Sequence, residues 1–258
     1  MPDPQIYRDH SHAAGYGGVA SSYGAYNYLG GLASGVKRAH FGAALHAARA
    51  HEGGTAIDFG CADGILLPSL SRSYERVWAI DLDPRFVETA RRVVMHHELA
   101  NVTVTCNADG ALPLLPPQLG GGADVLFALE TVEHVGERER MWESRADVLE
   151  GLFTLVRPGG EIVITVPTMV GPAFLAQRAA LRALGLRRER RISRGELLRA
   201  GLLWDTDALE RRWKAPSGHL GFNHVRLQRA MAERFEIVRK RHLVFQVLYV
   251  IRRREPPV

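Results

Sequence analysis

The stretch TAIDFGCADG, residues 55–64, is a short apolar run that ends at an acid and a glycine-rich turn. Four similar apolar runs follow it along the chain, and stretches with helical features lie between some of them. Strands that alternate with helices predict an α/β fold, in which a mostly parallel sheet is covered by helices on both faces. The four further runs are RVWAIDLD (76–83), VTVTC (102–106), ADVLFALE (123–130) and EIVITVP (161–167).

The segments between and after these runs complete the predicted sheet. Asp83 and Pro84 are typical of a helix N-cap and first helical residue, and a second helix is predicted from about residue 137 to 156, ended by RPGG. After Pro167 the alternation stops, and residues 168–215 are a long Arg-rich insertion. A short helix near 225–234 and two closely spaced strands, FEIVRKR and LVFQVLYVIRR, then predict an antiparallel hairpin at the C-terminus.

Composition limits the class of protein. The chain has 258 residues, of which 46% are hydrophobic and 24% charged, and this balance is typical of a globular protein rather than a disordered one. No run of about 18 apolar residues predicts a membrane span, and the first residues lack a secretory signal pattern. The two cysteines, Cys61 and Cys106, are too few for a disulfide scaffold or a four-thiolate zinc site. We therefore expect a soluble, cytoplasmic protein.

Charge is distributed unevenly along the chain. Residues 1–172 carry a net charge of −7, whereas residues 173–214 hold 11 Lys and Arg against 5 Asp and Glu, and residues 226–258 hold 9 against 3. An Arg-rich second half indicates an anionic partner, which could be a substrate, a membrane surface or nucleic acid. The alternative is a solvated charged face without a partner.

The glycine-rich turn indicates the kind of ligand. In an open parallel sheet, ligands bind at the carboxyl ends of the strands, and Asp81 ends the second strand as Asp58 ends the first. The glycines Gly60 and Gly64 lie four residues apart, unlike the spacing of a dinucleotide-binding turn. Asp63 lies within the turn and would repel a phosphate. The pattern therefore favours a nucleoside ligand without phosphates.

With these motifs in order, the sequence resembles the class I methyltransferases that depend on S-adenosylmethionine. DFGCADG resembles their first motif, AIDLDP the second and NADGALPL the third, while DVLFALETVEHV and LVRPGGEIVITVP resemble the stretches around their fourth and fifth strands. The resemblance implies a Rossmann-like methyltransferase fold with a mostly parallel seven-stranded sheet, and S-adenosylmethionine as cofactor. It implies that Asp81 binds the ribose hydroxyls and that Asp109 lies near the adenine amine. The predicted cofactor-binding residues are Asp58, Gly60, Cys61, Ala62, Asp63, Gly64, Asp81, Leu82, Asp109 and Glu130.

The residues after the fourth strand are candidates for the chemistry. Methyl transfer to a hydroxyl needs a base, and His134 is the best single candidate because its unperturbed pKa is about 6.5. Glu133 and His219 complete the predicted catalytic set. In the alternative interpretation, Glu133 caps a helix and His134 packs under the cofactor. Three of the residues Glu130, Glu133, His134 and His219 could also hold a divalent metal, but we assign no metal ligand.

The remaining segments are predicted to close the site. Residues 1–50, rich in Tyr and Gly, are expected to cover the cofactor, or else to be a disordered tail. Residues 51–258 are the predicted methyltransferase domain, in which residues 168–215 form a helical cap. The cap could bind an anionic acceptor, or its Arg and Trp residues could rest on anionic lipid. In the plainest alternative its arginines face solvent.

The predicted function is methyl transfer from S-adenosylmethionine, at oxygen, to a small-molecule, lipid-linked or sugar acceptor. A nucleic-acid methyltransferase is the first alternative. It is disfavoured because ETVEH (130–134) replaces the aromatic-Pro-Pro-Tyr type of sequence after the fourth strand, and because the arginines lack interleaved aromatic residues. A non-catalytic module that binds the cofactor is the second alternative. The sequence makes no prediction about the oligomeric state.

Overall fold

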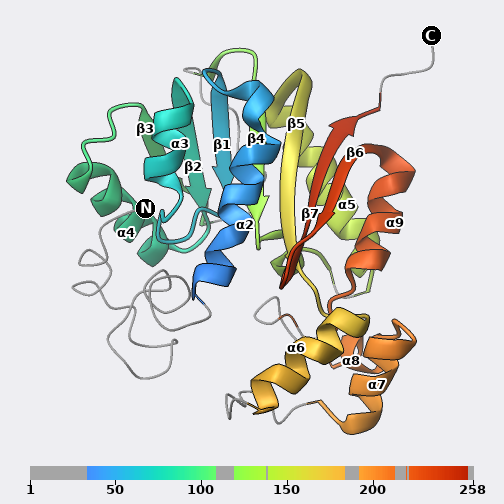
Figure 1. Ribbon diagram of the computed structural model, residues 1–258. Helices are drawn as coiled ribbons and strands as arrows, with labels where there is room; N and C mark the ends of the chain where they lie inside the picture. Colours follow the sequence, from blue (N-terminus) through green and yellow to red (C-terminus); the bar gives the residue numbers. More distant parts are fainter. Residues whose placement is uncertain are drawn as a thin grey trace.

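The fold is a seven-stranded sheet in the order β3-β2-β1-β4-β5-β7-β6 (Figure 1). The computed structural model describes residues 34–108, 119–137, 139–183, 192–212, 219 and 221–254. Strands β1 to β5 run parallel, and β7 is antiparallel to both β5 and β6. The predicted fold class is confirmed. The strands are β1 (Thr55–Phe59), β2 (Arg76–Asp81), β3 (Val102–Cys106), β4 (Ala123–Leu129), β5 (Val156–Pro167), β6 (Phe235–His242) and β7 (Gln246–Arg253).

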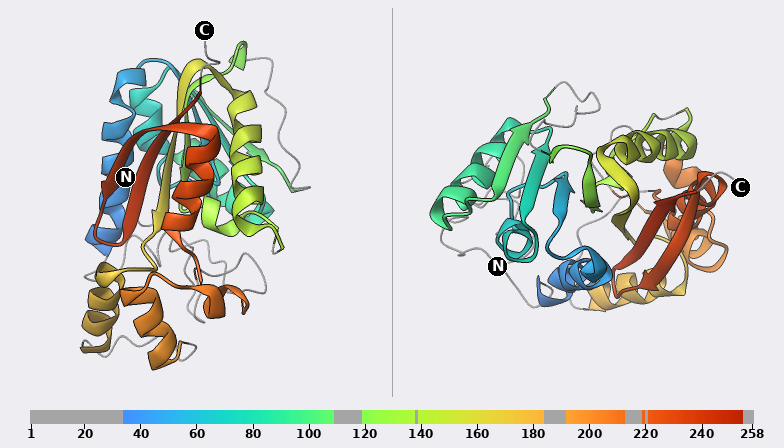
Figure 2. Two further views of the ribbon diagram at one scale, coloured as in Figure 1. Left: turned by 90° about the vertical axis from the view of Figure 1, so that its right-hand side faces the viewer. Right: turned by 90° about the horizontal axis from the view of Figure 1, so that it is seen from above.

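Helices cover both faces of the sheet (Figure 2). One face packs on α2 (Ser34–Ala47), α3 (Leu67–Ser73) and α4 (Pro84–His96), and the other on α5 (Met141–Leu152) and α9 (His224–Arg234). Alternate strand residues point to opposite faces, so that Ala56 joins the first apolar layer and Ile57 the second. Single-turn 3₁₀ helices lie at η2 (Arg49–His51), η4 (Val132–His134) and η5 (Phe153–Leu155).

One predicted helix boundary holds and another is wrong. Helix α4 begins at Pro84, and the Asp83 side chain accepts a hydrogen bond from the Arg85 amide at 2.9 Å, as an N-cap does. The helix predicted over 137–156 is shorter at both ends, and Val156 and the RPGG stretch belong to β5. The β4–β5 pairing passes from Ala123 with Val156 to Val125 with Glu161, so the RPGG stretch lies in a bulge of β5 instead of ending a helix.

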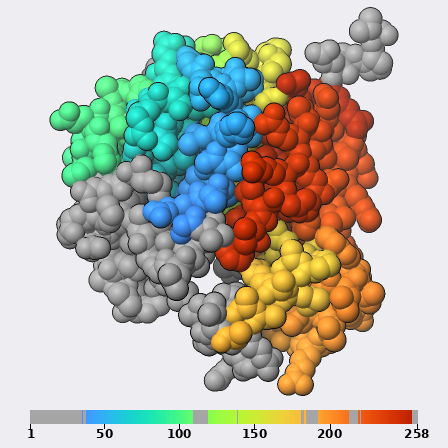
Figure 3. Space-filling view, viewed as in Figure 1, coloured from blue at the N-terminus to red at the C-terminus, as the bar shows by residue number. Residues whose placement is uncertain are grey.

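The insertion after β5 forms three helices below the carboxyl ends of the parallel strands, α6 (Pro172–Ala183), α7 (Arg194–Leu202) and α8 (Asp207–Glu210) (Figure 1). Figure 3 shows them, in yellow and orange, directly beneath the red C-terminal strands. Phe174, Ala200 and Leu209 are buried in the same apolar cluster as α5 and α9. The helices of the insertion therefore pack on the main core.

The strand order reverses between β1 and β4. These two strands are parallel neighbours, with Asp58 opposite Phe127, but β2 continues the sheet on one side and β5 on the other. The carboxyl ends of β1 and β4 therefore lie where α/β sheets bind ligands, in the crevice that such a reversal of strand order usually forms. Among the described residues, no helix has the length and apolar character needed to cross a membrane.

Candidate active site

The turn after β1 is shaped by its glycines. Gly60 and Gly64 have φ angles of +78° and +76°, which favour glycine. A Cβ atom at Gly60 would overlap the Thr131 side chain, and one at Gly64 would lie 3.0 Å from the Ala90 Cα. Both glycines are thus required by the protein's own packing. Ala62, in the same turn, has a φ angle of +46°.

The turn is joined to the end of β2 through Asp81. One Asp81 carboxylate oxygen accepts a hydrogen bond from the Ala62 amide at 2.8 Å, and the other accepts one from the Asp83 amide at 2.9 Å. Burial raises the pKa of Asp81, and these two hydrogen bonds act in the opposite direction. The carboxylate is therefore fixed in place at the edge of the crevice. Leu82, the next residue, is half exposed beside it.

Asp58 is a second buried carboxyl group near Asp81. Burial, and then the charge of Asp81, raises the pKa of Asp58 to about 7. Burial and the same two acids raise the pKa of the neighbouring Cys61 thiol well above its ordinary value, so Cys61 is unreactive. Asp63 is also buried. Within the described residues neither Asp58 nor Asp81 forms an ion pair, and a cationic ligand with hydroxyl donors would compensate both.

The bend after β4 carries the second part of the site. Glu130 has a φ angle of +54°, and its amide donates a hydrogen bond to the Thr165 carbonyl at 2.9 Å. The Thr131 hydroxyl donates to the carbonyls of Phe59 and Leu129, both at 3.2 Å. These bonds attach the bend to β1 and β5. The bend then leads into η4, which presents Glu133 and His134.

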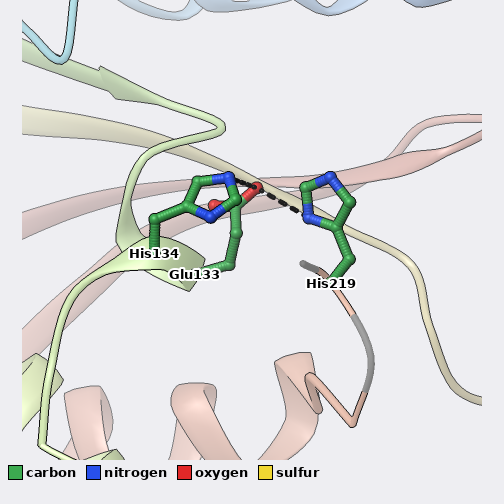
Figure 4. Close-up of side chains that lie close together, drawn as sticks. All are labelled: Glu133, His134 and His219. Atoms are coloured by element: carbon green, nitrogen blue, oxygen red, sulfur yellow. Dashed lines mark ion pairs between the residues drawn. The ribbon is translucent and has the colours of Figure 1, made fainter. Parts of the chain in front are cut away.

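Three predicted catalytic residues meet beside this bend (Figure 4). Glu133 Oε1 lies 3.9 Å from His134 Nε2 and 3.4 Å from His219 Nδ1, and the two imidazole rings are 5.2 Å apart. The Glu133 side chain is fully buried, whereas those of His134 and His219 are 35% and 44% exposed. One buried carboxylate thus faces two imidazoles that solvent, or a substrate, can reach.

This arrangement is suited to moving a proton. A buried carboxylate orients a neighbouring imidazole and stabilises the imidazolium that forms when the ring takes a proton. No described donor forms a hydrogen bond with either Glu133 carboxylate oxygen, so the charge of Glu133 is left to the imidazoles and to more distant groups. The ligand atoms of Glu133, His134 and His219 also lie within 4.8 Å of one another, close enough for all three to approach one cation.

The structure brings together most, but not all, of the predicted residues. The turn, Asp81 and the Glu133 cluster lie at the ends of three neighbouring strands. Asp109 and the tyrosine-rich residues 1–33 lie outside the described residues, so their predicted roles stay predictions. The sequence analysis missed Thr131 and Arg145. Arg145 is 1% exposed, and its position four residues from both Met141 and Leu149, on the apolar face of its helix, was the available signal.

Known proteins resemble this chain. The methyltransferase domain family model matches residues 57–164. The ubiquinone biosynthesis O-methyltransferase of Cupriavidus pinatubonensis is 31% identical over 109 residues, which are 42% of this chain and 39% of the relative. The corresponding enzyme of Xanthomonas axonopodis pv. citri is 28% identical over 122 residues, 47% of this chain and 46% of its own. The chain thus spans less than half the length of these curated relatives.

A solved structure shares the fold. The N-methyltransferase NodS from Bradyrhizobium japonicum WM9, in complex with S-adenosyl-L-homocysteine, superimposes with a TM-score of 0.55 at 14% identity. The match covers 85% of this chain and 88% of NodS. At this level of identity the similarity concerns the fold alone.

Proposed function

Because the methyltransferase domain family model matches residues 57–164, we propose that this chain is an S-adenosylmethionine-dependent O-methyltransferase of small molecules. The observation that carries the proposal is the cluster of Glu133, His134 and His219, which lies beside the acidic turn at the reversal of strand order. A methyltransferase that acts on oxygen needs a base next to its cofactor site. The curated relatives are named as O-methyltransferases, which supports the same reaction.

Asp58 and Asp81 fit S-adenosylmethionine. The cofactor carries positively charged ammonium and sulfonium groups and two ribose hydroxyls, and it supplies an electrophilic methyl group. Each Asp81 oxygen accepts one backbone N–H and keeps a further lone pair for a ribose hydroxyl. Because burial raises the pKa of Asp58 to about 7, a cation beside this carboxyl group would favour its fully ionised form.

The histidines act on the acceptor. His134 or His219 would take the proton of an acceptor hydroxyl held beside the cluster. The bound cofactor would supply the methyl group, because its sulfonium–methyl bond would break as the oxygen–methyl bond forms and would leave a neutral thioether. Glu133 stabilises the resulting imidazolium, and the exposed edges of both rings give the acceptor access. Either histidine could be the base, and Glu133 serves both.

A divalent cation is a second way in which the same cluster could work. The close approach of the three ligand atoms favours it, because a bound cation would orient the hydroxyl and lower its pKa. Activity that survives exhaustive treatment with EDTA would exclude this version. Loss of activity that Mg²⁺, Mn²⁺ or Zn²⁺ restores would establish it.

The acceptor is proposed to be a small hydroxyl compound. The positive excess of the insertion lies mainly in residues 173–191, since residues 192–212 hold four Arg against four Asp and Glu. Several of those four arginines are paired locally, as Arg199 is with Asp205 and Arg212 with Glu196. Four further points stay proposals: that the insertion is a cap, that the acceptor is anionic or lipid-linked, that the protein contacts a membrane peripherally, and that it is cytoplasmic.

The test is a methyl-transfer assay with panels of phenols, sugars, lipid-linked hydroxyl compounds and RNA. We expect His134→Gln and His219→Gln each to lower kcat by about 10²-fold while the Kd of S-adenosylmethionine changes less than about twofold. His96→Gln, an exposed histidine on α4, is the matched control and should leave both quantities unchanged. Methylation of RNA alone would favour the nucleic-acid alternative. Cofactor binding without transfer to any acceptor would favour the non-catalytic one.

A further inference from the structure

Arg145 is a buried arginine that contacts the backbone segment of Glu133. It projects from α5 and is 1% exposed, one of the largest fully buried side chains of the protein. Buried arginines are rare unless their N–H groups are satisfied, because removing the charge from water is costly. The contacts of this guanidinium group must therefore compensate for its burial.

The guanidinium binds the backbone of the segment that carries Glu133 and His134. Arg145 Nε donates hydrogen bonds to the carbonyls of Val132, at 3.1 Å, and Val135, at 3.2 Å. Arg145 Nη2 donates to the carbonyl of Glu133 at 2.8 Å. Three carbonyls within four residues thus converge on one side chain. This set of contacts fixes the backbone of η4 from the side away from the crevice.

The same guanidinium also contacts the segment that carries His219. Its central carbon lies 4.7 Å from the Trp142 ring centre and 5.0 Å from that of Phe222, and the two rings are 5.7 Å apart. The Phe222 amide donates a hydrogen bond to the His219 carbonyl at 3.1 Å, which closes a turn. Cation–π contact with Phe222 therefore links Arg145 to the turn that begins at His219.

The charge of Arg145 is kept in this environment. Burial lowers the pKa of Arg145 to about 10, and the carboxylates of Glu133 and Glu210 act to raise it. The group is therefore positively charged at neutral pH. Lysine would keep the charge, but its single ammonium could not offer the planar fork that reaches three carbonyls and also lies against two rings.

We propose that Arg145 is a positioning residue that holds His134 and His219 at the same buried carboxylate. Through η4 it sets the backbone under Glu133 and His134, and through Phe222 it sets the turn under His219. This positioning role rests on the proposed function in one respect. The arrangement of the histidines affects turnover only if one of them is the base.

The kinetic test compares Arg145→Lys with Arg140→Lys, a matched exposed arginine at the start of the same helix. We expect Arg145→Lys to lower kcat at least about tenfold with the cofactor Kd within twofold, and Arg140→Lys to change neither. His219→Gln should then lower kcat by only about tenfold when it is added to Arg145→Lys, although alone it lowers kcat by about 10²-fold. Additive losses would overturn the proposal.

A second readout does not need methyl transfer. In the wild type, His219→Gln should shift the ring proton resonances of His134, because the two rings are 5.2 Å apart. The shift should be lost when the protein also carries Arg145→Lys. Phe222→Leu, which keeps the arginine, should reduce the shift, and it can be used if Arg145→Lys fails to fold. A shift that persists at full size in whichever of these variants folds would refute the positioning role. If the coupling depends on Arg145 but no acceptor is methylated, the proposed function fails and the positioning role stands.

Discussion

The two halves of the candidate site are built in different ways. The acidic half, with Asp58 and Asp81, consists of consecutive turn residues and the end of the adjacent strand, and backbone amides fix Asp81 directly. The histidine half joins η4 to His219, which lies far along the chain beyond the insertion, and depends on side chains such as Arg145. The acidic half is therefore encoded by residues close together in the sequence. The histidine half, in contrast, is brought together only when distant segments of the chain fold against one another.

The electrostatics of the two halves differ as well. In the acidic half, burial and then the nearby charge of the partly buried Asp81 raise the pKa of Asp58 to about 7. In the histidine half, a single buried carboxylate faces two imidazoles, and a buried guanidinium lies behind it. The described residues of the acidic half are therefore negatively charged and suit a cationic ligand. The histidine half already contains imidazole and guanidinium groups that can carry a positive charge.

The largest effect is expected on the affinity for S-adenosylmethionine, which should depend on the acidic half and not on the histidine half. Asp81→Ala should raise the Kd of S-adenosylmethionine by at least about tenfold, because hydrogen bonds to a carboxylate contribute roughly 1.5–3 kcal/mol each. At saturating cofactor, kcat should stay within about threefold, since the histidine half is intact. Calorimetry and steady-state kinetics measure the two quantities. Asp83→Ala, which removes the neighbouring N-cap carboxylate, serves as the control and should leave the Kd unchanged. An unaltered Kd in Asp81→Ala would contradict the cofactor assignment.

A smaller effect tests the strain within the acidic half. Because its folded-state pKa is raised to about 7, Asp58 favours folding at low pH, and this contribution is lost as the pH rises from about 4 to 7. Asp58→Asn should therefore stabilise the free protein at pH 8 by about 1–2 kcal/mol, or a few degrees in Tm, and have little effect at pH 5. Cofactor affinity should fall at pH 8. Equal Tm changes at both pH values would show that ionisation of Asp58 is not the cause.

The smallest effect concerns the turn itself. Ala62 has a φ angle of +46°, a left-handed conformation that costs an alanine roughly 1–2 kcal/mol. Ala62→Gly should stabilise the protein by about 0.5–1 kcal/mol, because glycine relieves this strain but loses more entropy on folding. The amide that binds Asp81 is kept, so cofactor affinity should not change. Urea titration measures the stability, and a destabilised variant would show that the methyl group of Ala62 has a packing role.

Much of the fold could be predicted because its signals are local. Each parallel strand was visible as a short apolar run, and Asp83-Pro84 marked the start of α4 correctly. The start of β5 could not be predicted, since RPGG ordinarily ends a helix. In the structure RPGG forms a bulge of β5, between the residues that pair with Ala123 and Val125 of β4. Pairing between distant segments decided that boundary.

The site shows the same limit. Asp58, Asp81, the residues after β4 and His219 were all predicted as candidates, but no spacing in the sequence fixes the distance from His219 to Glu133. That distance depends on the path of the chain through the insertion and on the contact of Phe222 with Arg145. Arg145 carried a usable signal as an arginine on an apolar helix face. Its three carbonyl partners, however, could be known only from the fold.

Strand β6 has a consequence for how copies of the chain meet. It lies at one end of the order of the described strands and pairs with β7 on one side. None of the described strands pairs with its other backbone edge, to which a foreign strand could add. The exposed residues Arg239, Lys240 and Arg241 place positive charge along that edge. A second molecule presenting the same edge would be repelled. The basic C-terminal hairpin thereby protects the protein against edge-to-edge aggregation, whatever further role its charge has.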